Sequence, residues 1–169
     1  MSMKTIYEIT EEKSISFSTL KDEQPLLLDQ AFDVVMLPSV YHSKAFHVGA
    51  ADLFSYLKDN IGEDVVQILV SDEDYQEVGL HSKALRIGVV IITAVIAPIF
   101  TSVLSDYISN ELNGSPGDEL EMTVIIERPQ QVNIKLDYKG DVNEVHKVLD
   151  KIKELADGKE NIEPPKLGK

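Results

Sequence analysis

The stretch Ile87–Leu104, IGVVIITAVIAPIFTSVL, decides how this chain is interpreted, because its eighteen residues include no charged side chain. A helix of that length rises about 27 Å, which approaches the hydrocarbon thickness of a thin bilayer. The stretch therefore predicts one long apolar helix. Two environments suit such a helix: a membrane, which it would span once, or the centre of a protein core, where a helix is also apolar on every side.

The flanking charges favour the membrane interpretation and give it an orientation. Lys83 and Arg86 precede the apolar part, whereas Asp106 and Glu111 follow it. Positive side chains collect on the cytoplasmic side of membrane helices, so we expect a membrane protein with its N-terminal region in the cytosol. The alternative is a soluble cytoplasmic protein.

Small residues recur at every fourth position of the predicted helix, and this spacing predicts contact with a second helix. They are Thr93, Ala97, Thr101, Ser105 and Ser109. Small side chains let two helix backbones approach closely, so the simplest prediction is a homo-oligomer that associates along this seam. Pro98 lacks a backbone N–H and is predicted to kink the helix.

Residues 1–80 predict a small mixed α/β region. Short alternating runs at 4–20 favour a β-hairpin. The apolar run LLLDQAFDVVMLPSV at 26–40 suits either a buried strand or a short helix, and its periodicity does not separate them. Apolar residues on one face predict a helix over 44–60, and VVQILV at 65–70 predicts a strand.

The long helix is assigned to 81–113, where a turn-forming sequence ends it, and a ββα unit is predicted over 118–158. Alternating stretches at 119–127 and 132–139 predict two antiparallel strands with one polar face, and a helix capped by Asp141 follows them. The expected fold class is therefore α+β. We expect the tail, 159–169, to be mobile, because it has two prolines and few apolar side chains.

Composition excludes several classes of function. The net charge is −13, and no stretch is rich in Lys or Arg, so nucleic acid is not an expected partner. The chain has no cysteine, which removes disulfides, thiolate catalysis and zinc sites with Cys ligands. An acidic surface of this kind suits a basic protein partner.

No catalytic or ligand-binding motif emerges from the sequence. His42 and His47 are five residues apart, which is a poor helical spacing for a metal pair, and the acidic turn at 72–74 lacks the glycine and the final glutamate of a calcium loop. We therefore assign no catalytic, cofactor-binding or metal-binding residue, and we predict no enzyme.

Two hypotheses follow for the function. The leading one is a non-enzymatic, self-associating membrane protein with a single span, such as a small bacterial membrane effector or tether. The alternative is a soluble acidic interaction or assembly module whose apolar helix is buried in its own core or by a partner.

Overall fold

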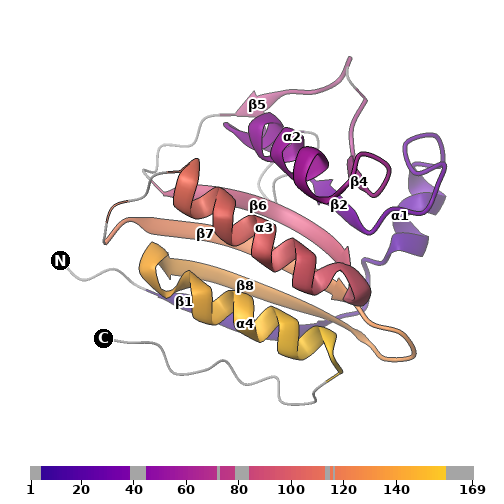
Figure 1. Ribbon diagram of the computed structural model, residues 1–169. Coiled ribbons are helices and arrows are strands. Elements are labelled where there is room, and N and C mark those ends of the chain that lie inside the picture. The colour runs from indigo at the N-terminus through magenta and orange to yellow at the C-terminus, as the bar shows by residue number, and fades with distance from the viewer. Residues whose placement is uncertain are drawn as a thin grey trace.

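The computed structural model describes residues 5–38, 45–71, 73–78, 84–112, 115 and 117–158. Within these residues the chain forms a mixed α+β fold, as expected, with four α-helices and eight strands. Six strands form one sheet in the order β1-β8-β7-β6-β2-β4, and β3 pairs with β5 in a separate two-stranded sheet. Figure 1 shows α2, α3 and α4 lying side by side on one face of the large sheet.

The bounds of the elements follow the chain. The strands are β1 (Ile6–Glu12), β2 (Val34–Leu37), β3 (Phe46–His47), β4 (Val66–Ile68), β5 (Glu77–Val78), β6 (Leu85–Thr93), β7 (Glu119–Glu127) and β8 (Asn133–Asp141). The α-helices are α1 (Phe17–Glu23), α2 (Ala50–Ile61), α3 (Ala97–Asn110) and α4 (Val145–Ala156). Short 3₁₀ turns, Ala94–Ile96 and Val142–Glu144, precede α3 and α4.

The apolar stretch 87–104 is not one helix, and this part of the prediction is wrong. Its first half belongs to β6, which pairs with β2 on one side and β7 on the other. Val90 and Ile92 enter the core under the helices, whereas Val89 and Ile91 pack on the opposite face. A strand buried on both faces is continuously apolar, so it shows no alternation that would distinguish it from a helix.

The second half of the stretch leads into α3, a helix of fourteen residues that continues beyond Leu104 and has a single charged side chain, Asp106. No helix in the described part of the chain has both the length and the hydropathy needed to cross a membrane. Pro98 stands in the first turn of α3, where the missing N–H has no partner within the helix, so it begins the helix and does not kink it.

The C-terminal ββα unit forms as predicted. β7 and β8 are antiparallel neighbours, and side chains along β8 alternate between buried and partly exposed. The Asp141 carboxylate accepts a hydrogen bond from the backbone N–H of Asn143 at 2.8 Å, at the start of the turn that leads into α4. The predicted tail lies outside the described residues.

The N-terminal region differs from its prediction in three places. There is no hairpin at 4–20, because β1 pairs with β8 and is followed by α1. The open choice at 26–40 resolves as a strand, β2, whose four residues are all buried. The helix predicted over 44–60 begins at Ala50, as α2, because Phe46 and His47 form β3. The strand predicted at 65–70 is present as β4, which is shorter.

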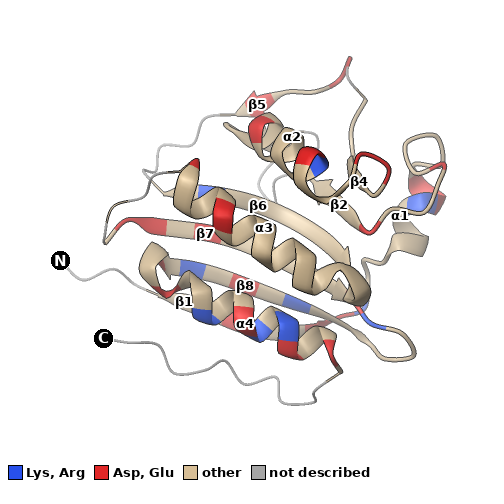
Figure 2. Ribbon diagram, viewed as in Figure 1, with Lys and Arg blue, Asp and Glu red and all other residues tan. Residues whose placement is uncertain are grey.

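Two apolar cores lie on the two faces of the large sheet. The larger core lies under α2, α3 and α4, where Leu57, Phe100 and Ile152 are fully buried. The smaller core lies on the opposite face, where Leu20 of α1 and Leu28 pack against β2, β6 and β7. Figure 2 shows charges of both signs along α4, whereas α3 is almost free of them.

Candidate functional site

A hollow lies on the face of the sheet opposite α2, α3 and α4. Its cavity volume is about 720 Å³, within the range of about 300–1,000 Å³ that is common for ligand pockets. The apolar lining comes from Ile15, Leu20, Leu26, Leu27, Leu37, Pro38, Leu69, Val70 and Val89. The polar lining comes from Ser14, Thr19, Glu23, Gln24, Ser71 and Asp74. We call this hollow the groove.

The groove exists because helices cover only part of this sheet face. Neighbouring strands place Leu37 opposite Val89 in the register of β2 and β6, which makes an apolar floor. The short helix α1 and residues 24–28 form one wall, and Leu69, Val70, Ser71 and Asp74, after β4, contribute to the other. Leu26 stands on the first wall with 91% of its surface exposed. Leu26 thus places an exposed apolar side chain beside the apolar floor.

Side-chain hydrogen bonds hold the first wall against the rest of the fold. The Glu127 carboxylate accepts from the backbone N–H of Phe17 at 2.9 Å, and the Asn133 amide donates to the carbonyl of Ile15 at 3.1 Å. Further along, the Gln67 amide donates to the carbonyl of Leu27 at 3.0 Å. The wall is thus anchored at both ends, and the groove between it and the sheet is preformed.

The other half of this sheet face is polar and largely satisfied. The Thr123 hydroxyl donates to the Asp137 carboxylate at 2.6 Å, and Arg86 forms an ion pair with Glu121 at 2.8 Å. Lys139 lies 3.7 Å from a carboxylate oxygen of Glu121. These side chains are partly exposed and paired with each other, so they form the solvent-facing surface predicted for β8.

A second cluster, around His47, has a structural explanation. The Tyr75 hydroxyl donates to the Glu77 carboxylate at 2.6 Å, and the same carboxylate accepts from the backbone N–H groups of Gly49 and Ala51 at 3.3 and 3.4 Å. The hydrogen bond from Tyr75 lowers the pKa of Glu77. Glu77 therefore caps the N-terminus of α2 from β5, where Gly49 has no side chain to do so.

His47 itself is buried, with 7% of its surface exposed. Burial lowers its pKa, and the positive charge of Arg86 lowers it further. A neutral ring in that position packs the β3 segment against β6 at Gly88. His42, which was compared with His47 as a possible metal-binding pair, lies outside the described residues. Among the residues that the structure describes, no group of three or more His, Asp or Glu side chains is placed to hold a metal ion.

The predicted seam residues are divided between two elements. Thr93 is the last residue of β6, and its hydroxyl donates to the Asp33 carboxylate at 2.9 Å, so it does not extend the helical row. Ala97 is fully buried, and the Thr101 hydroxyl donates to its carbonyl at 2.9 Å. Ser109 is exposed near the end of α3.

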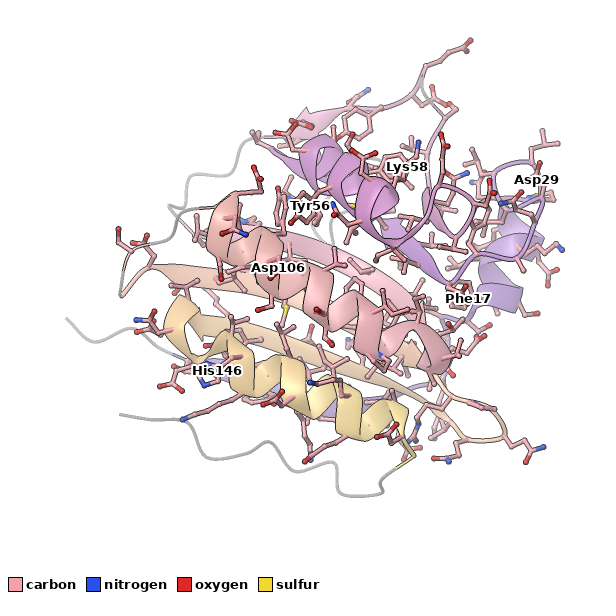
Figure 3. All side chains as sticks on the ribbon, in the orientation of Figure 1. Phe17, Asp29, Tyr56, Lys58, Asp106 and His146 are labelled. Atoms are coloured by element: carbon pink, nitrogen blue, oxygen red, sulfur yellow. The ribbon has the colours of Figure 1, made fainter. Side chains whose placement is uncertain are left out.

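A small hollow lies beside this row, between α3 and α4. Its volume is about 240 Å³, and its lining includes Thr101 and Ser105 from α3 and Leu149 from α4. Asp106 and His146, on its two sides, are labelled in Figure 3. Thr101 and Ser105 therefore face a helix of the same chain, and the homo-oligomer stays a prediction.

Comparison with protein-family models, with curated proteins and with solved structures gives no match to this chain.

Proposed function

We propose that this chain is a non-enzymatic interaction module that takes an apolar segment of a partner protein into the groove. The observation that carries the proposal is the preformed apolar floor of Leu37 and Val89 beneath an anchored wall that exposes Leu26. Burying one such leucine on binding contributes about 1–2 kcal/mol, somewhat less than complete burial of the side chain. A few such contacts are enough for a transient complex.

A peptide segment fits the groove better than a small molecule does. Small-molecule sites usually bury most of the surface of their ligand. Here Leu26 projects at the rim, where an occupant confined to the hollow would leave it exposed. A chain that crosses the rim would cover Leu26 and the floor together.

This proposal develops the second hypothesis drawn from the sequence, in which the apolar stretch is buried in the chain's own core. Both β6 and α3 contribute buried residues to the larger core, among them Val90, Ile92 and Phe100. Location at a membrane with the N-terminal region in the cytosol, and location in the cytoplasm, both stay predictions.

The test is a selection of binding peptides from a random-sequence library, followed by measurement of Kd for the recovered peptides. Leu26→Ser should weaken the binding of the recovered peptides about five- to thirtyfold, which corresponds to about 1–2 kcal/mol. The matched control is Val95→Ser, because Val95 is also an exposed apolar residue, with 79% of its surface accessible, but belongs to the turn before α3. This control should leave Kd unchanged.

Methyl NMR gives an independent readout of the site. A bound peptide should shift the methyl signals of Leu37 and Val89, which line the groove, more than those of Val95. If the library yields no peptide, or if the recovered peptides bind equally to the wild type and to Leu26→Ser while shifting neither floor residue, the proposal is wrong.

A further inference from the structure

We infer that the segment bound in the groove is cationic, with positive side chains on either side of its apolar anchor. This inference rests on the proposed function and adds the charge of the partner. It comes from the rim of the groove, where the two charged side chains among the described lining residues, Glu23 and Asp74, are both carboxylates. They belong to different walls, one to α1 and the other to the turn after β4.

Neither carboxylate is neutralised within the described part of the chain. No ion pair there involves Glu23 or Asp74. Asp74 accepts one hydrogen bond, from the hydroxyl of Ser71 at 3.0 Å, which positions the carboxylate without cancelling its charge. Lys21 is on the same helix as Glu23 but does not line the groove. The rim therefore presents two negative charges to whatever occupies the groove.

The position of Glu23 gives no benefit to the helix that carries it. Glu23 is the last residue of α1, and the C-terminal end of a helix carries partial negative charge that disfavours a carboxylate. Its role is thus better explained by an interaction outside the helix. The net charge of −13 adds a long-range attraction for a positive segment, which raises the rate of association.

The experiment compares two double variants that remove the same number of negative charges. E23Q/D74N removes both carboxylates of the rim, whereas D106N/E111Q removes two exposed carboxylates of α3 and its C-terminal end, neither of which lines the groove. The sheet separates these two carboxylates from the groove, because α3 covers the opposite face. The screening length at physiological salt is about 8 Å, so their charges contribute little to the potential at the rim. All four substituted side chains are exposed, so we expect both variants to fold.

The measurement is Kd for the tightest peptide from the random-sequence library, at about 0.15 M and about 0.5 M salt. We expect the recovered peptides to be enriched in Lys and Arg. E23Q/D74N should weaken binding about three- to tenfold at the lower salt concentration, as for one or two exposed charge pairs, and the higher concentration should remove most of this difference. D106N/E111Q should change Kd less than twofold.

The possible results separate the two proposals. If the peptides shift the methyl signals of Leu37 and Val89 but show no basic enrichment, and E23Q/D74N binds them as tightly as the wild type does, the charge inference is overturned and the groove function stands. If D106N/E111Q weakens binding as much as E23Q/D74N, net charge explains the preference, and the role of the rim is overturned. If no recovered peptide depends on the groove, the proposed function itself fails.

Discussion

Replacing Gly88 with alanine should destabilise the fold through two separable effects. Gly88 has a φ of +84°, and alanine in that region costs about 1–2 kcal/mol. In addition, an alanine Cβ would lie 2.8 Å from Cε1 and 2.9 Å from Nδ1 of His47. The buried imidazole has little room to move, so this crowding costs about 1–3 kcal/mol more. The total expected loss of unfolding free energy is about 2–5 kcal/mol.

Gly49 supplies a control that isolates the backbone effect. Its φ of +97° is similar, but no atom lies within 4 Å of the position that a Cβ would take. Urea denaturation followed by circular dichroism should therefore show a loss of about 1–2 kcal/mol for Gly49→Ala and a larger loss for Gly88→Ala. Adding His47→Ala to Gly88→Ala should reveal a coupling of about 1–2 kcal/mol, because the clash is then removed. Equal losses for the two glycine variants, without coupling, would refute the packing of His47 on Gly88.

Three further substitutions test other parts of the fold. Burial and the charge of Arg86 lower the pKa of His47 below its value of about 6.5 in the unfolded chain. The unfolded state therefore takes up the proton first, and the free energy of unfolding should fall as pH drops through about 6.5. His47→Gln should flatten that part of a stability–pH profile; an unchanged slope would show that His47 is not its source. Glu77→Gln should cost about 0.5–1 kcal/mol by weakening the cap of α2, and thermal unfolding at neutral pH would measure it. Ala97→Leu should cost about 1–3 kcal/mol, because Ala97 is fully buried, and an unchanged melting temperature in dilute monomer would contradict the packing of α3.

The C-terminal ββα unit could be predicted because each of its signals is local. Ile134, Leu136 and Tyr138 alternate with polar residues, and this alternation matches a sheet that is covered on one face and open on the other. β7 and β8 are also joined by a short connection, so pairing them requires no knowledge of distant segments. The same reasoning places Asp141 before α4.

The central stretch could not be predicted from periodicity because β6 is buried on both faces. The available signal was composition: Val89, Val90, Ile91, Ile92 and Thr93 are all β-branched, which favours a strand over a helix. Hydropathy is nearly uniform along the run, so it does not distinguish the β-branched segment from the helical one. The length of the run then suggested one element where the structure has a strand, a turn and a helix.

The groove could not be predicted because its lining comes from segments that are distant in the sequence. Leu20 lies on α1, Leu37 on β2, Leu69 beyond β4 and Val89 on β6. Each of these leucines and valines looks like an ordinary core residue in its own segment. Only the strand order shows that α1 covers part of one sheet face and leaves the rest open.

The pairing of β1 with β8 sets the order in which the protein can fold. Ile6 is opposite Lys139, so β1 finds its partner only after every strand from β2 to β7 has been made. Contacts between such distant residues form slowly, because a long loop must close first. Until β8 has been made, β1 has no partner in the sheet. The negative charges of its exposed Glu8 and Glu11 then disfavour pairing of β1 with copies of itself. The sheet can therefore be completed only once β8 has been made, and a fragment that ends before β8 lacks the strand that pairs with β1.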